Sequence, residues 1–157
     1  LSGAGYRVAV ATNQSGLSRG YFDLDTLESI HAELVRRVEE RGGELAGIFY
    51  CPHLPGEGCN CRKPATGLLC AIETELAESA AGAWFVGDSL KDLQAARAHG
   101  CRPVLVTTGK GGATLQDLRS GKAALQDPQS VPVYADLASA VDAILADGRG
   151  SRPCDPA

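Results

Sequence analysis

The sequence predicts an α/β fold in which helices cover both faces of a parallel sheet. Short apolar segments alternate with longer amphipathic segments along the chain, which is the order expected for parallel strands joined by crossover helices. The 157 residues are 44% hydrophobic and 22% charged, the balance of a soluble globular protein. A chain of this length is able to bury a core of its own.

The first half of the chain predicts two strands and two helices. The strands are the β-rich runs YRVAVA at 6–11 and GIFYC at 47–51. Between them, Asp25 and Glu28 have the spacing of a capping box, and Gly42 is placed to end the helix that they begin. One face of this helix is apolar, with Leu27, Ile30, Leu34, Val35 and Val38. The second helix carries Leu68, Leu69, Ile72 and Leu76.

The second half alternates in the same way. AWFV at 83–86 and PVLVT at 103–107 predict strands, separated by a helix from Leu90 to His99 that Gly100 closes. Residues 113–130 show little pattern, and we expect them to be irregular. Residues 131–134 predict a last short strand. The helix after it has an apolar face with Leu137, Val141, Ile144 and Leu145. We expect one domain over 1–147 and a flexible tail over 148–157.

Charge and hydropathy exclude two classes of partner. The net charge of −4 provides no basic excess for a nucleic-acid surface. No apolar run approaches the roughly 18–20 residues that span a bilayer. Residues 1–12 show neither the basic start nor the cleavage site of a signal peptide. We therefore expect a cytoplasmic protein without membrane or nucleic-acid partners.

Three cysteines and one histidine lie close together in the sequence, as Cys51, His53, Cys59 and Cys61. Three thiolates and one imidazole make a closed tetrahedral set, which is typical of structural zinc and leaves no position for a reacting water. Such a site suits a reducing compartment. Free thiols or a redox pair are the alternative interpretation. The isolated Cys70 and Cys101 lie in apolar surroundings, and we expect them to pack in the core.

Polar residues follow the predicted strands, at Thr12, Cys51, Asp88 and Thr108. Ligands of parallel α/β sheets bind beyond the carboxyl ends of the strands, so we expect a site at this edge. Arg62 and Lys63 directly follow the last zinc-ligand candidate and suit a phosphate group. A solvated basic turn is the alternative for this pair.

Asp88 and Asp92 lie four residues apart where a predicted strand enters a helix. Asp88 suits a magnesium ion, which prefers oxygen ligands. Asp92, one turn later, is placed to orient a lysine or a water. A helix cap and a surface acid are the alternative. The segment TNQSG at 12–16 offers hydroxyl, amide and backbone N–H groups to phosphate oxygens, although it is also a favourable turn sequence.

Taken in order, these segments resemble the haloacid dehalogenase phosphatases, and most closely their D-glycero-D-manno-heptose 1,7-bisphosphate 7-phosphatase branch. The resemblance lies in TNQSGLSRGYF at 12–22, FYCPHLP at 49–55, CNCRKP at 59–64, GDSLKDLQAA at 87–96 and TGK at 108–110. It implies a three-layer Rossmann-like fold with a zinc-binding loop. It also implies magnesium-dependent hydrolysis of a phosphorylated sugar through an aspartyl phosphate, in the supply of heptose for surface polysaccharide. Because the compact zinc loop offers little for a large lid, we expect a small, open-site monomer.

The resemblance also implies roles for individual residues. Thr12 and Lys63 would stabilise the transferred phosphoryl group, Arg62 would help to recognise the substrate, and Asp88 would ligate Mg2+. The residues expected to bind substrate are Thr12, Asn13, Gln14, Ser15, Arg62 and Lys63. Zn2+ would be held by Cys51, His53, Cys59 and Cys61. The role of Lys110 is left open.

The sequence departs from the family in one respect. Family members carry a nucleophilic aspartate in a D-x-D-G motif on a first, central strand, and residues 1–11 here contain no aspartate. Asp23 and Asp25 have the spacing but enter a helix, where they predict a cap. We therefore expect the fold to lack that strand, with an unpaired edge between the strands ending at Thr12 and Gly87. We also expect residues 1–157 alone to be unstable and inactive, and the reading frame upstream of Leu1 tests this.

Two other functions stay open. Histidinol-phosphate phosphatases have a similarly short zinc loop, although Ser15 and the RG-YF and TGK segments favour the heptose branch. A zinc-dependent pseudoenzyme without catalysis is the second alternative. The presence of Thr12, Lys63 and Asp88 favours an enzyme over it.

Overall fold

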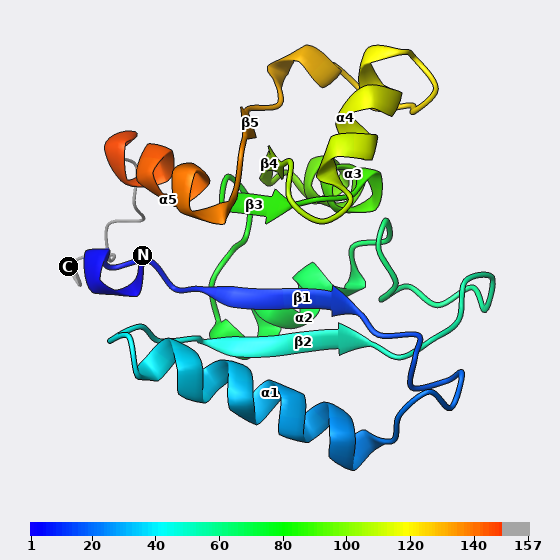
Figure 1. Cartoon of the computed structure of the whole chain (residues 1–157), viewed down its shortest axis with the longest axis vertical. Coiled ribbons are helices and arrows are strands. Elements are labelled where there is room, and N and C mark those ends of the chain that lie inside the picture. The colour runs from blue at the N-terminus through cyan, green and yellow to red at the C-terminus, as the bar shows by residue number, and fades with distance from the viewer. Residues whose placement is uncertain (149–157) are drawn as a thin grey trace. The chain divides into compact units, whose positions relative to one another are not determined.

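A computed structural model describes residues 1–148 of the chain, so the predicted tail lies outside the described residues except for Gly148. Strands and helices alternate as the sequence predicts (Figure 1). The strands are β1 (Ala9–Asn13), β2 (Gly47–Cys51), β3 (Trp84–Gly87), β4 (Arg102–Val106) and β5 (Val133–Tyr134). The helices are α1 (Leu24–Glu39), α2 (Gly67–Leu76), α3 (Leu90–His99), α4 (Gly111–Arg119) and α5 (Leu137–Ala146). Two short 3-10 helices are η1 (Ser2–Ala4) and η2 (Pro128–Ser130).

The described chain forms two compact units. Unit 1 comprises residues 1–62 and 67–78, and unit 2 comprises residues 63–66 and 79–148. Unit 1 therefore holds β1, β2, α1 and α2, and unit 2 holds the remaining strands and the helices α3, α4 and α5. The single domain expected over 1–147 stays a prediction.

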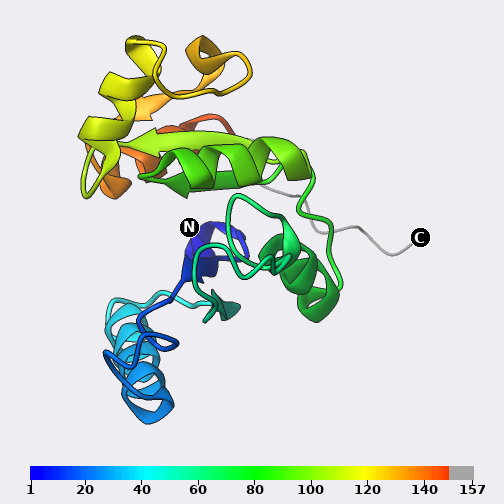
Figure 2. The same ribbon diagram turned by 90° about the vertical axis from the view of Figure 1, so that its right-hand side faces the viewer.

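Unit 1 is built on two parallel strands between two helices. β1 and β2 pair in register from Ala9 opposite Gly47 to Asn13 opposite Cys51. Helix α2 packs against both strands, and α1 lies on the other face of the pair (Figure 2). The buried side chains of this unit are Leu27, Cys51, Leu68 and Leu69. The strands thus leave the unit's core at one common edge, where their polar ends meet.

Unit 2 has three layers around a parallel sheet in the order β3-β4-β5. Successive side chains of the central strand β4 point to opposite faces. Leu105 packs with Leu93 of α3 and with Val131 on one face. Val104 and Val106 pack with Ala140 of α5 on the other. This unit confirms the predicted α/β architecture with helices on both faces of a parallel sheet.

The described strands form two separate sheets, one in each unit. Among the described residues, β1 pairs with β2 alone, and β3 ends its own sheet beside β4. The strands that carry Thr12 and Gly87 therefore share no paired neighbour within the described chain.

Helix α1 differs from the prediction at its start. It begins at Leu24, and the carboxylate of Asp23 accepts a hydrogen bond from the Thr26 amide at 2.9 Å, so the cap predicted at Asp25 is wrong. Asp23 caps the helix because it directly precedes the first helical residue, so its side chain faces the free N–H groups of the first turn. Of the predicted apolar face, Leu27 is buried, whereas Ile30 and Leu34 are 53% and 38% exposed.

Two further predictions are wrong. Residues 113–130 are not all irregular, because α4 forms and its Leu115 and Leu118 pack against the cluster around Leu105. Cys70 is exposed on α2, whereas Cys101 is buried as expected. The predicted end of α3 is confirmed, with Gly100 in the left-handed region at φ 83°. No helix among residues 1–148 is long and apolar enough to cross a bilayer.

Candidate active site and metal centre

The TNQSG segment lies at the carboxyl edge of unit 1. The sequence predicted that Thr12 follows the strand. The structure places it inside β1, opposite Tyr50, because this strand runs from Ala9 to Asn13. The amide of Gln14 donates to the carbonyl of Cys51 at 2.7 Å, and its side-chain amide donates to Thr12 Oγ1 at 3.3 Å. The four residues expected to line the site, Thr12, Asn13, Gln14 and Ser15, are half-buried. Their polar groups are therefore fixed beside the start of the cysteine loop.

The four expected zinc ligands converge. Their donor atoms all lie within 4.8 Å of one another: Cys51 Sγ, His53 Nδ1, Cys59 Sγ and Cys61 Sγ. Cys51 Sγ is 3.1 Å from Cys61 Sγ and 3.7 Å from Cys59 Sγ, and His53 Nδ1 is 3.2 Å from Cys61 Sγ. Around a tetrahedral zinc, sulfur and nitrogen donors stand roughly 3.6–3.8 Å apart. The donor set therefore has nearly the geometry of a closed zinc site.

Electrostatics indicate that this cluster suits a cation. Burial, together with the neighbouring sulfurs of Cys51 and Cys59, raises the pKa of the Cys61 thiol from its ordinary 9.0 to about 12. Three thiolates so close together repel one another unless a positive charge lies between them. A divalent ion supplies that charge, which makes the donor set chemically suited to zinc.

The loop returns to the core through two specific contacts. The guanidinium of Arg62 donates to the carbonyl of His53 at 2.9 Å, while its buried Nε has no hydrogen-bond partner among the described residues. The amide of Gly67 donates to the carbonyl of Asn60 at 2.8 Å. A Cβ at position 67 would overlap with Asn60 O, so only glycine permits this approach. Arg62 is thus anchored to the zinc loop, with its Nε buried.

In unit 2, Lys63 is held by a buried carboxylate. Its Nζ lies 2.6 Å from Asp92 Oδ1, and the two side chains are 12% and 8% exposed. Asp92 Oδ2 accepts hydrogen bonds from the amide and the hydroxyl of Ser89, at 3.1 and 2.7 Å. Asp92 therefore caps α3 and orients the lysine at once, as the spacing of the acids suggested. Both of its oxygens therefore have partners in unit 2.

Asp88 directly follows β3 and is held differently. Its Oδ2 accepts a hydrogen bond from the Lys110 amide at 2.9 Å, and its main-chain carbonyl accepts one from the Thr114 hydroxyl, also at 2.9 Å. Its Oδ1 has no partner among the described residues. A carboxylate oxygen left open at the end of a strand fits a hard cation such as magnesium. The sequence did not predict the contacts from Lys110 and Thr114.

The predicted residues thus fall into two groups. Unit 1 holds the TNQSG segment, the zinc ligands and Arg62, and unit 2 holds Lys63 and Asp88. Within each unit the structure brings the expected side chains to the carboxyl edge of the strands. That both groups serve one substrate, and the role of each residue, stay predictions.

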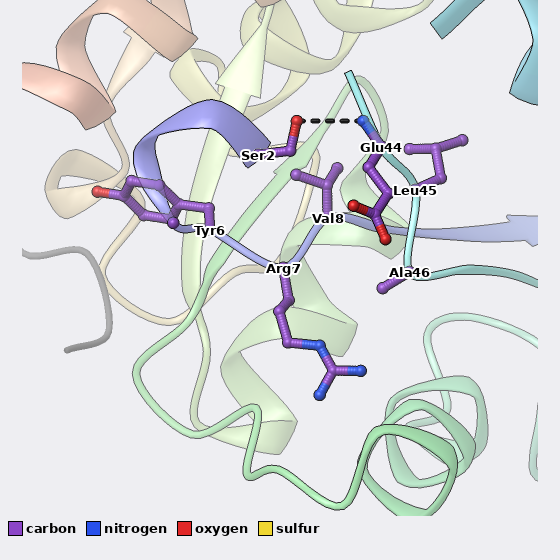
Figure 3. Close-up of a pocket in the computed structure, with 8 residues that line it drawn as sticks. Ser2, Tyr6, Arg7, Val8, Glu44, Leu45 and Ala46 are labelled. Carbon is purple, nitrogen blue, oxygen red and sulfur yellow. Dashed lines mark hydrogen bonds between the residues drawn. The ribbon is translucent and has the colours of Figure 1, made fainter. Parts of the chain in front are cut away.

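A cavity of about 360 Å³ lies elsewhere in unit 1, at the other end of β1 (Figure 3). It is lined by Ser2, Gly5, Tyr6, Arg7, Val8, Glu44, Leu45 and Ala46. The Ser2 hydroxyl accepts a hydrogen bond from the Glu44 amide, and Arg7 is paired with Glu78 at 2.8 Å. None of the predicted site residues lines this cavity, so it is distinct from the candidate site.

Residues 60–140 match the family model described as HAD-hydrolase-like. The chain is 52% identical, over 145 residues, to a D-glycero-beta-D-manno-heptose-1,7-bisphosphate 7-phosphatase from Pseudomonas aeruginosa; the match covers 92% of this chain and 77% of that protein. It is 44% identical to the enzyme of the same name from Bordetella bronchiseptica, with the same coverage.

Solved structures show the same relationship. D,D-heptose 1,7-bisphosphate phosphatase from B. bronchiseptica, complexed with magnesium and phosphate, superposes with a TM-score of 0.84 at 43% identity. The superposition covers 94% of this chain and 78% of that one. The corresponding phosphatase from Burkholderia thailandensis gives a TM-score of 0.66 at 36% identity, covering 92% of this chain and 79% of that chain.

Proposed function

Because the chain belongs to the haloacid dehalogenase-like hydrolases, and within them to the heptose bisphosphate phosphatases, we propose that it removes the C7 phosphate of D-glycero-D-manno-heptose 1,7-bisphosphate. The reaction is hydrolysis of a phosphoric monoester. The substrate is a small phosphorylated sugar, as the names of its relatives indicate.

The observation that carries this proposal is the buried pair of Lys63 and Asp92 in unit 2, the unit that also holds the open carboxylate oxygen of Asp88. A lysine fixed by a buried partner presents a cation in a defined position, and such preorganised charge stabilises the transferred phosphoryl group more than a mobile one. Magnesium bound by Asp88 would offset further negative charge on the phosphoryl oxygens. Both groups belong to unit 2, where Lys63 Nζ also lies 5.7 Å from the ring centre of Phe85 in β3.

The residues of unit 1 would serve recognition. The Thr12 hydroxyl and the Asn13, Gln14 and Ser15 side chains offer neutral hydrogen bonds to phosphate oxygens, which hold the group without adding charge. Arg62 supplies a donor fork for a phosphate or hydroxyl group of the sugar. Zinc in the cysteine loop would act structurally, since its four protein ligands leave no open position. The aspartyl-phosphate intermediate is a prediction from the family resemblance.

The test is phosphate release by the protein expressed from its complete gene. Purified protein is incubated with the heptose bisphosphate and with histidinol phosphate, with and without MgCl2, and inorganic phosphate is measured. 31P NMR of the sugar product identifies which phosphate is lost. Lys63→Met is expected to lower kcat by about 100-fold or more, as for other preorganised charges in active sites. Lys91→Ala, which removes an exposed lysine of α3, is the matched control.

Each outcome decides between the functions left open by the sequence. Magnesium-dependent loss of the C7 phosphate, abolished by Lys63→Met and kept by Lys91→Ala, supports the proposal. Preferential hydrolysis of histidinol phosphate would contradict the proposal and identify the protein as a histidinol-phosphate phosphatase. No hydrolysis of either compound by a folded, zinc-loaded protein would favour a pseudoenzyme.

We further propose that the protein is a cytoplasmic monomer. Cysteines that hold zinc must stay reduced, and the cytoplasm is a reducing compartment. Light scattering on the purified protein measures the mass in solution, and a mass of twice the chain would contradict the proposed monomer.

A further inference from the structure

The segment after β4, residues 108–114, packs directly on Asp88; it comprises a turn and the start of α4 and is called the turn at 108–114 below. The Lys110 amide donates to Asp88 Oδ2 at 2.9 Å, and the Thr114 hydroxyl donates to the Asp88 main-chain carbonyl at 2.9 Å. Thr114 is 8% exposed, so its hydroxyl is shielded from water and its hydrogen bond has little competition. One short segment therefore holds both the carboxylate and the backbone of Asp88.

Two glycines make this approach possible. Gly109 has φ 59°, in the left-handed region, and a Cβ there would overlap with Asp88 Oδ2. A Cβ at Gly111 would overlap with the carbonyl of Val106. At Gly112, by contrast, a Cβ would meet only Thr107 O at an ordinary 3.8 Å. A side chain at position 109 or 111 would therefore clash with its neighbours, whereas one at position 112 would not.

The contact sorts the two oxygens of Asp88 into different roles. Oδ2 is engaged by the Lys110 amide, and Oδ1 has no partner among residues 1–148. Hydrogen bonds to a metal-binding carboxylate fix its orientation and tune its affinity for the ion. An Asp88 side chain that is already held does not lose rotamer freedom when it binds an ion.

We propose that the turn at 108–114 is the positioning element of the magnesium site, in which Gly109 and Thr114 fix Asp88 so that Oδ1 faces the ion. The inference rests on the proposed function, because it takes Asp88 as the magnesium ligand. Gly109 and Thr114 are positioning residues: they touch Asp88, and through it they set the affinity for Mg2+. The Lys110 side chain has no part in this role, since only its main-chain amide is used.

The experiment measures magnesium affinity directly. MgCl2 is titrated by calorimetry into the complete protein carrying Gly109→Ala, Thr114→Val or Thr114→Ser, with Gly112→Ala as the matched glycine control. Loss of an outer-shell partner of a metal ligand lowers metal affinity by about 10–100-fold, which we expect for Gly109→Ala and Thr114→Val. Thr114→Ser keeps the hydroxyl and is expected to recover most of the affinity. Gly112→Ala is expected to bind like the parent.

A second readout separates positioning from general damage. In phosphate release, the MgCl2 concentration for half-maximal rate should rise in Gly109→Ala and Thr114→Val, while kcat at saturating MgCl2 changes less. Parental affinity in both variants would overturn the inference. If Gly109→Ala does not fold, the comparison of Thr114→Val with Thr114→Ser decides alone. A parent protein that binds no Mg2+ would contradict the proposed function itself, a result distinct from parental affinity in the variants.

Discussion

Lys63 and Asp92 form an ion pair that is almost entirely removed from water. The Nζ–Oδ1 distance is 2.6 Å, and Ser89 satisfies the second oxygen of the acid. Removing two charges from water costs several kcal/mol, and their attraction repays this only when the geometry is good and the remaining hydrogen bonds are made. Those conditions are met here, so the pair places a cation accurately without leaving an unpaired charge.

Replacing Asp92 with Asn should destabilise unit 2. The lysine would then be buried without a counter-charge, and breaking such a pair costs about 3–5 kcal/mol of unfolding free energy. Glu78→Gln is the control, because it breaks a pair with Arg7 whose side chains are 46% and 55% exposed. Exposed pairs are worth about 0–1 kcal/mol. Urea denaturation measures both, and equal losses in the two variants would show that burial of the Lys63 pair carries no extra energy.

Spacing in the sequence was enough to find some site residues and not others. The zinc quartet lies within residues 51–61, and Asp92 lies four residues after Asp88, so local spacing identifies each of them. Thr114 contacts a residue 26 positions earlier, and the glycines of its turn resemble an ordinary loop. Nothing local marks such a partner, because the fold brings it to Asp88.

At the scale of elements, the loop from Cys51 to Cys61 depends on its metal. The loop contributes one buried side chain, Cys51, and has few apolar residues for a core of its own. Binding of structural zinc supplies on the order of 10 kcal/mol to the segment that it orders. The loop in turn anchors Arg62 through the His53 carbonyl.

The purified protein should contain one zinc ion per chain. Cys59→Ala removes one of the four converging donors and is expected to lose the metal, whereas Cys70→Ala removes an exposed thiol outside the cluster and should keep it. Mass spectrometry of the metal content measures this. Equal zinc in both variants would mean that the ion is held elsewhere.

Helix α1 gives a prediction for pH. Hydrogen bonds from the Arg36 and Arg37 side chains lower the pKa of Glu33 from 4.5 to about 2. Because the folded pKa is the lower one, the stabilisation is present above about pH 4.5 and is lost as the pH falls towards 2. Glu33→Gln should therefore lower Tm slightly at pH 7, and its Tm should approach that of the parent near pH 2.

Thermal unfolding followed by circular dichroism checks this difference. Glu39→Gln, which makes no ion pair among the described residues of α1, is the control and should track the parent at every pH. A Tm difference for Glu33→Gln that stays constant from pH 7 to pH 2 would refute the assigned cause.

Helix α4 was not predicted from the sequence, and its packing explains why. Its apolar residues Leu115 and Leu118 are too few for a helical pattern, and two glycines stand at its start. The helix forms because these leucines pack against Leu93 and Leu105, which come from α3 and β4. Tertiary packing thus overrides a weak local preference. Helix α3, whose end is marked by Gly100, was predicted from Leu90 to His99, which are its observed bounds.

At the scale of the whole molecule, alternation of strands and helices predicts the layers but not the division into units. Parallel pairing within each sheet follows from the crossover helices, as expected. The division follows from contacts between distant segments: residues 63–66 belong with unit 2, although their sequence continues the zinc loop of unit 1. The boundary between the units falls between the adjacent residues Arg62 and Lys63, where no local feature of the sequence marks it.

This division leads to a last prediction, that removing zinc acts locally. All four zinc ligands belong to unit 1, whereas Lys63 is held by Asp92 and Asp88 by the turn at 108–114, all within unit 2. Chelation should therefore increase amide hydrogen exchange in residues 51–61 and leave the buried strand β4 protected. The magnesium affinity of the chelated protein should match that of the zinc-loaded form. If β4 loses its protection together with the loop, residues 1–147 unfold as one cooperative domain and the independence of the two units is refuted.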